Sequence, residues 1–150
     1  GPDADKKVLK GQALLYRAFS HYQLVQIYGK RYVNGVDNSQ MGVPLALTVS
    51  DQPLARATVE QVYAQINKDL DEANTLLVGY PKQNNSHLGL SVAQGLKARV
   101  ALTQGNWAIA ADYAAKAKTG VALMNAEEYV KGFNDFNAKE WMWGSHVSEV

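Results

Sequence analysis

The chain has 150 residues, of which 47% are hydrophobic and 19% charged, and its basic and acidic side chains leave a net charge of +1. This composition predicts one folded domain with a sizeable core and argues against disorder, and it gives no bulk charge for nucleic acid or an anionic membrane. The absence of cysteine excludes disulfides, thiol catalysis and cysteine-ligated metal.

The first predicted element is a long helix, about residues 4–28, which Asp3 or Asp5 can cap and Gly29 ends. Apolar side chains recur at helical spacing on two adjacent faces. They are Leu14, Ala18, His21, Val25 and Tyr28 on one face, and Leu15, Phe19 and Tyr22 on the other. A surface this wide needs neighbours on two sides, which favours a helix inside a layered helical array with its aromatic residues in packing roles.

Residues 30–56 have no helical period and are rich in turn-forming residues. Val43 precedes a proline, so residues 43–45 are expected to be extended. A loop of about 27 residues is unusually long for a compact domain. Its polar tip, residues 34–40, either reaches a ligand or partner or is an ordinary solvated loop.

A second helix is predicted over about residues 58–78, because Thr58 and Gln61 have the spacing of a capping box. Its apolar positions are Val59, Val62, Tyr63, Ile66, Leu70, Ala73, Leu76 and Leu77. Asp69, Asp71 and Glu72 are close in sequence, as acid/base carboxylates can be. We assign all three to the solvated outer face of the helix.

Two further helices, about residues 91–104 and 106–119, are predicted to fold back on each other at Gly105 and Asn106. Small residues on the facing sides allow close packing, and Trp107 is expected to fill the gap near the turn. The spacing resembles the tetratricopeptide repeat. The matching residues are Ala98, Gly105, Trp107, Ala110 and Ala117, whereas Lys97 and Ala114 stand where that pattern usually has large apolar residues.

The C-terminal part is predicted to hold a short helix, about residues 126–131, and an extended segment at residues 140–143. Trp141 and Trp143 alternate in that segment and so point to the same face. Paired exposed indoles suit stacking against sugar rings. The alternative is that they cover an apolar edge of the helical array.

The sequence contains no motif for catalysis, cofactors or metals that we can assemble. The glycines are not spaced as a phosphate-binding loop requires, and His21, His87 and His146 lie far apart. The adjacent Ser–His pairs at residues 86–87 and 145–146 lack an orienting acid. We therefore expect no enzyme, no cofactor and no metal site.

Several motifs, in order, resemble the SusD/RagB family of Bacteroidota outer-membrane nutrient-binding and glycan-binding lipoproteins. The matching stretches are KGQALLYRAFSHYQLVQIYGKRY at residues 10–32, MGVPL at 41–45, RATVEQVY at 56–63, INKDLDEA at 66–73, KARVAL at 97–102 and GNW at 105–107. Ala101 departs from the aromatic residue that is commoner at its position. An ordered set over most of the chain is more specific than any one motif.

The resemblance implies an all-α fold of tetratricopeptide-like helical hairpins with long connecting loops and a short extended C-terminal segment. We expect residues 1–150 to be a single α-helical domain, excised from a longer SusD-like protein, because neither a signal peptide nor a lipoprotein cysteine is present.

The resemblance also implies cell-surface binding of a glycan and its delivery to a SusC-like TonB-dependent outer-membrane transporter, with this segment mainly scaffold and transporter contact. Membrane attachment would be through a lipid anchor only. The alternative is a free-standing helical-repeat adaptor that binds a protein partner. Trp141 and Trp143 are our candidate ligand-binding residues, inferred from their chemistry and not from the resemblance.

Overall fold

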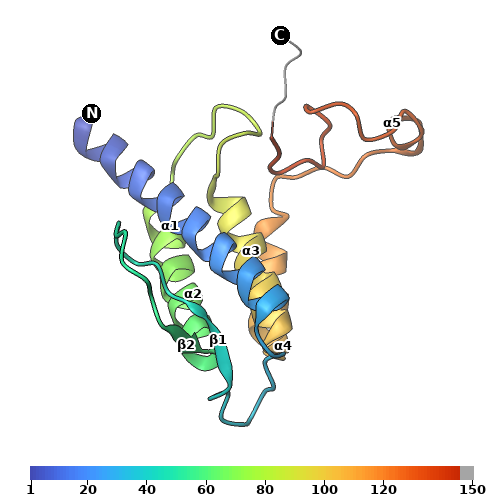
Figure 1. Ribbon diagram of the computed structural model, residues 1–150. Helices are drawn as coiled ribbons and strands as arrows, with labels where there is room; N and C mark the ends of the chain where they lie inside the picture. Colours follow the sequence, from blue (N-terminus) through green and yellow to red (C-terminus); the bar gives the residue numbers. More distant parts are fainter. Residues whose placement is uncertain (146–150) are drawn as a thin grey trace.

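The computed structural model describes residues 1–145 and is mainly helical (Figure 1). Two short strands form the regular β-structure of this described part. The elements are α1 (Pro2–Tyr28), β1 (Met41–Pro44), β2 (Arg56–Thr58), α2 (Val59–Leu76), α3 (Leu90–Thr103), α4 (Trp107–Ala117) and α5 (Ala126–Val130). The predicted all-α fold class is confirmed.

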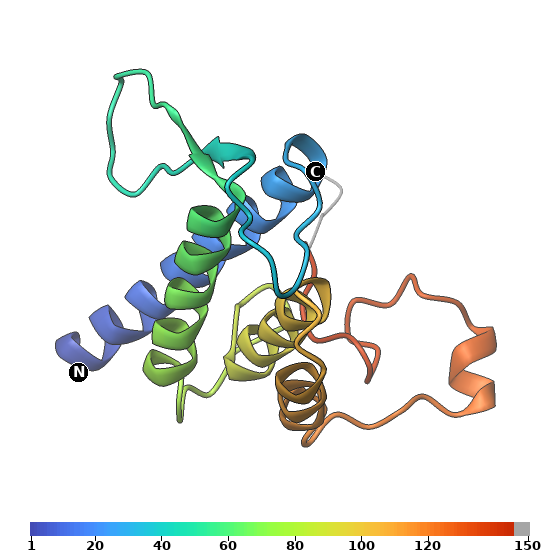
Figure 2. The ribbon, with the colours of Figure 1, turned by 90° about the horizontal axis from the view of Figure 1, so that it is seen from below.

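The core lies between α1, α2 and the facing side of α3. Figures 1 and 2 show α1 crossing α2, with the α3–α4 hairpin beside them. Buried apolar side chains include Leu15, Ala18, Tyr22 and Val25 of α1, Val59, Val62, Ile66, Leu70 and Ala73 of α2, and Ala93, Leu96 and Val100 of α3. These are the positions that helical spacing predicts. Tyr28 is the exception, because its side chain is exposed.

The start of α1 differs from the prediction. Gly1 is the N-cap and Pro2 the first helical residue, so neither Asp3 nor Asp5 caps the helix. Both carboxylates lie in the first turn instead, where negative charge interacts favourably with the helix dipole. Proline is well suited to the first helical position because it needs no backbone partner there.

The loop at residues 30–56 is more ordered than predicted. β1 and β2 pair as an antiparallel two-stranded sheet, in which Met41 faces Thr58. Asn38, in the polar tip, is fully buried: its amide nitrogen donates to the carbonyls of Val33 and Val36, and its Oδ1 accepts from the Val33 N–H. The tip is therefore organised around one asparagine that satisfies the loop backbone.

The capping box at the start of α2 is confirmed, because Thr58 and Gln61 exchange side-chain and backbone hydrogen bonds. The placement of Asp69 on the solvated face is wrong. Its side chain is 2% exposed and receives two bonds from the Arg17 guanidinium, at 2.8 and 2.7 Å. The spacing within α2 gave no sign of this partner on α1, and the ion pair joins the two longest helices.

The α3–α4 hairpin forms as expected, with Gly105 at a φ of 72° between the helices. The N–H groups of Gly105 and Asn106 bond back to the carbonyls of Leu102 and Ala101 and so close the end of α3. Asn106 occupies the N-cap of α4, but its side chain makes no capping bond. The expected packing role of Trp107 is wrong, since this side chain is 67% exposed.

Lys97 is nearly buried on α3, although a charged residue departs from the repeat pattern there. Its ammonium group donates to Asn67 Oδ1 at 3.0 Å and pairs with Asp71 at 2.7 Å, so two residues of α2 satisfy it. The departure is accommodated by polar partners on the neighbouring helix.

Residues 121–139 lead away from the bundle and carry α5 to one side of it (Figures 1 and 2). Asn125 and Glu128 form a capping box at the start of α5. None of the helices in the described residues has the length and apolar character needed to cross a membrane.

Candidate functional site

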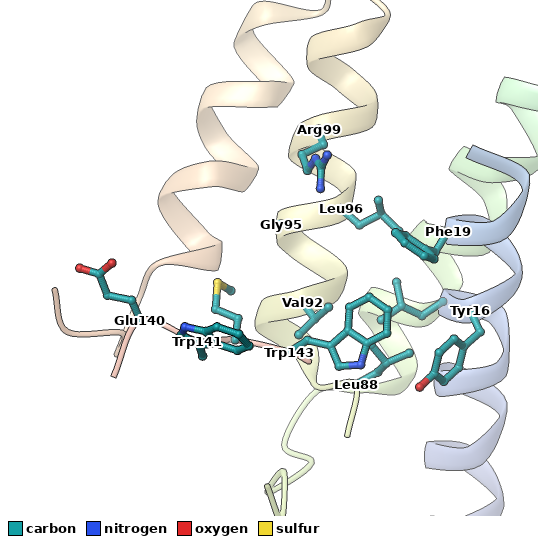
Figure 3. Close-up of a pocket in the computed structure, with 12 residues that line it drawn as sticks. Tyr16, Phe19, Leu88, Val92, Gly95, Leu96, Arg99, Glu140, Trp141 and Trp143 are labelled. Atoms are coloured by element: carbon teal, nitrogen blue, oxygen red, sulfur yellow. The ribbon is translucent and has the colours of Figure 1, made fainter. Parts of the chain in front are cut away.

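A pocket of about 460 Å³ lies between α1, α3 and the C-terminal segment (Figure 3). Most of its surface is apolar. Its lining residues are Leu15, Tyr16, Phe19, Leu88, Val92, Gly95, Leu96, Arg99, Glu140, Trp141, Met142 and Trp143. Three segments that are distant in sequence therefore build one concave surface, which is the usual form of a ligand site.

The α1 wall is aromatic. Tyr16 and Phe19 are three residues apart and so lie on the same side of the helix. Both meet the Trp143 ring edge-on, with centroid separations of 5.8 and 5.3 Å. This T-shaped arrangement is favourable for aromatic pairs. Trp143 thus also covers part of the apolar core, as one of the two alternatives predicted.

The α3 wall is formed by residues one turn apart along the helix. Gly95 exposes bare helix backbone between Val92 and Arg99, and a Cβ there would meet only Ala117, at 3.9 Å. Arg99 lies at one end of the pocket with an exposed side chain (Figure 3). The pocket is therefore open along α3 and has a cation at that end.

The third wall is the segment 140–144. Glu140 accepts a hydrogen bond from the Met124 N–H at 2.7 Å, and Figure 3 shows its carboxylate directed away from the indole rings. The Trp141 ring lies against Gly144, where a Cβ would approach its ring carbons to 3.1 Å. A larger residue at position 144 would therefore require the Trp141 ring to shift by a few tenths of an ångström.

Polar residues of the α2–α3 connection hold this third wall. Lys82 Nζ donates to the Met142 carbonyl at 2.8 Å, and Asn85 Nδ2 donates to the Phe136 carbonyl at 2.9 Å. The Gly144 N–H in turn donates to the Asn85 carbonyl at 2.9 Å. Burial lowers the pKa of Lys82 from its usual value.

The structure brings Trp141 and Trp143 into one pocket, with both side chains half-buried. Sequence reasoning missed Tyr16, Arg99 and the wall-holding residues Lys82 and Asn85. The three-residue spacing of Tyr16 and Phe19 on α1 was an available signal. No local pattern connects that helix to a segment more than 120 residues later.

The histidines do not form a common site. His21 is buried in α1, where burial lowers its pKa, and its Nδ1 has no hydrogen-bond partner. The Nδ1 of His87 shares a hydrogen bond of 2.9 Å with the Tyr80 hydroxyl. His146 lies outside the described residues. Within residues 1–145, no cluster of acidic residues and histidines has the arrangement of a metal site.

The fold and the pocket define a tetratricopeptide-like helical scaffold with an aromatic concave surface. Residues 2–102 match the SusD-like family model described as starch-binding and associating with the outer membrane. The chain belongs to this family, as its motifs predicted. A comparison with curated proteins finds no match.

Solved structures agree with this assignment. The chain is similar to a SusD-like carbohydrate-binding protein from Bacteroides vulgatus ATCC 8482, with 29% identity and a TM-score of 0.83 over 99% of this chain and 32% of that one. A SusD superfamily protein from Bacteroides thetaiotaomicron VPI-5482 has 28% identity and a TM-score of 0.75, over 85% of this chain and 28% of that one. Another SusD superfamily protein, from B. vulgatus ATCC 8482, has 26% identity and a TM-score of 0.72, over 87% of this chain and 31% of that one. The chain thus spans about a third of the length of these relatives.

Proposed function

We propose that this chain is the helical part of a cell-surface glycan-binding protein, and that its aromatic pocket takes part in holding a saccharide. The observation that carries the proposal is the pocket shared by Trp141, Trp143 and the α1 aromatics. Indole faces provide flat apolar surfaces for the C–H faces of sugar rings. The family description and the carbohydrate-binding relative support a sugar as the ligand class.

The proposed activity is binding without chemical change. The charged residues in the pocket lining are Arg99 and Glu140, and the Glu140 carboxylate is already bonded to the Met124 backbone. Arg99 projects from α3 and Glu140 from the C-terminal segment, and Figure 3 shows that their charged groups are not directed toward each other, so they do not form a convergent acid/base pair. Delivery of the bound glycan to a SusC-like transporter at the outer-membrane surface, with the helices as scaffold and transporter contact, is part of the same proposal.

Isothermal titration calorimetry against plant and host polysaccharides, with maltoheptaose as the soluble starch probe, tests the proposal. We expect heat from at least one glycan and weakening by at least about fivefold in Trp141→Ala, because roughly 1 kcal/mol of stacking is lost. Trp143→Ala is expected to behave similarly, with its melting temperature measured alongside because Trp143 also packs on α1.

Trp107→Ala is the matched control, since Trp107 is exposed at the α3–α4 turn and does not line the pocket. Binding should be unchanged in this variant. The absence of heat from every glycan with a folded chain, or an equal loss of affinity in Trp107→Ala, would contradict a saccharide site in this pocket.

A further inference from the structure

The pocket wall that carries both indoles has no regular secondary structure. Residues 131–145 contain neither a helix nor a strand, so no ladder of backbone hydrogen bonds fixes their path. Their position depends on bonds to other parts of the chain. Lys82 and Asn85 make such bonds at three points of this wall, namely Phe136, Met142 and Gly144.

Lys82 and Asn85 also act on each other. Lys82 Nζ donates to Asn85 Oδ1 at 2.9 Å, so the two side chains form one connected unit, called here the Lys82–Asn85 bridge. The stem of Lys82 lies along Gly89, where an added Cβ would be 3.4 Å from Lys82 Cδ.

The charge of Lys82 is not balanced by a carboxylate in the described part of the chain. Its bonds go to two neutral oxygen atoms, although the ammonium group is partly removed from water. Such desolvation costs free energy, and no ion pair of Lys82 in the described residues offsets this cost. What the arrangement provides is a fixed separation between the α2–α3 connection and the Met142 backbone, 60 residues later.

The bridge reaches both indoles through the backbone. Met142 lies directly between Trp141 and Trp143, so its carbonyl fixes the chain on both sides. Gly144 is held by the Asn85 carbonyl and is also the surface on which the Trp141 ring rests. A shift of this wall relative to α1 would therefore withdraw Trp143 from Tyr16 and Phe19 and displace the backbone that carries Trp141.

We propose that Lys82 and Asn85 are positioning residues that set the geometry of the aromatic pocket without contacting its contents. Neither residue lines the pocket. The effect of Lys82 and Asn85 on saccharide binding rests on the proposed function, whereas their effect on the positions of Trp141 and Trp143 does not. The two can therefore be tested separately.

Tryptophan fluorescence in a Trp107→Phe background tests the bridge without a ligand, because Trp141 and Trp143 are then the remaining tryptophans. We expect Lys82→Met to red-shift the emission and to increase acrylamide quenching about twofold, since solvent gains access to the indoles. Helix content should stay unchanged, and melting should stay within about 3 °C, because the bridge is outside the main core.

Lys82→Arg retains the charge and donors and should restore most of the parent emission. Asn85→Ala removes the side-chain bonds to Lys82 and to the Phe136 carbonyl but leaves the backbone bond to Gly144, so it should change emission and quenching in the same direction as Lys82→Met. Lys68→Met is the matched control, since Lys68 is an exposed lysine on α2. Parent-like emission and quenching in folded Lys82→Met and Asn85→Ala, or an equal change in Lys68→Met, would overturn the proposal.

Calorimetry then separates the two proposals. If maltoheptaose or a polysaccharide of the panel binds the parent, Lys82→Met should weaken that binding at least about tenfold through loss of preorganisation. An unchanged dissociation constant overturns the positioning role. If no glycan binds the parent, the proposed function fails, and the fluorescence still decides whether the bridge positions the indoles.

Discussion

Two glycines inside helices are expected to respond in opposite ways to the same substitution. Gly95→Ala should stabilise the chain by about 0.5–1 kcal/mol, because alanine favours the helix and its Cβ would meet only Ala117 at 3.9 Å. Gly11→Ala should destabilise it by about 1 kcal/mol or more. Its Cβ would lie 3.0 Å from Leu77 Cγ and 3.1 Å from Leu76 Cβ, where α1 and α2 approach closely.

Urea unfolding monitored by circular dichroism measures both changes. Each variant serves as the control for the other, since the intrinsic gain in helix propensity is the same and only the surroundings differ. Stabilisation by both substitutions would show that α1 and α2 have room to separate at Gly11.

Single residues also show where local sequence reasoning stops. Asp69 follows the spacing of a charged helix face, yet its partner is Arg17, 52 residues earlier. Trp107 has the position of a packing aromatic in a repeat, yet its side chain is largely exposed. Spacing predicts which side chains share a face, but it does not predict what that face meets.

At the scale of elements, the Arg17–Asp69 ion pair is expected to add little net stability itself. Removing only Arg17 should nevertheless be costly, because a buried carboxylate is then left without a partner. Arg17→Met should cost about 3–5 kcal/mol, because it leaves the Asp69 carboxylate buried between α1 and α2 without its cation. The double variant Arg17→Met, Asp69→Leu should recover most of that loss, since apolar side chains can replace a buried pair.

Equilibrium unfolding of the two single variants and the double variant gives this cycle. Lys116→Met is the control at an exposed pair, because Lys116 meets Asp112 on the surface of α4, and it should leave stability unchanged. A double variant as unstable as Arg17→Met would contradict the explanation by an unpaired buried charge.

The elements themselves could largely be predicted, because the signals that form them are local. The Thr58–Gln61 capping box, the Gly105 turn and the apolar period of α2 all lie within a few residues of what they determine. The β1–β2 pairing could not, since it joins strands separated by an irregular loop with no tight-turn motif. Loop order here depends on Asn38, whose burial has no signature in its neighbours.

At the scale of the whole molecule, the candidate site could be predicted only in part. The alternation of Trp141 and Trp143 indicated a shared face, and the structure places both in the pocket. The opposing wall is on α1, and the bonds that hold the segment come from Lys82 and Asn85. Because the site is assembled from segments that are distant in sequence, each local stretch can predict only its own part of the site.

The pH dependence of global stability should depend on His21. Its side chain is 4% exposed and its Nδ1 is unpaired, with Arg17 and Asp69 the charged groups that act on it. Burial lowers the pKa of His21 below 6.5, so the unfolded chain binds a proton in a range where the folded chain does not. Stability should therefore be fully present above pH 6.5 and fall as the pH drops toward the folded pKa, by at most about 1.4 kcal/mol per pH unit.

Urea unfolding at a series of pH values, for the parent and His21→Gln, measures the effect as a difference between the two curves. The carboxylates titrate in both proteins and largely cancel, so the difference should change below pH 6.5 and be flat above it. A difference that does not vary with pH would show that the fold accepts a charged His21, and that Asp69 offsets the cost of its burial.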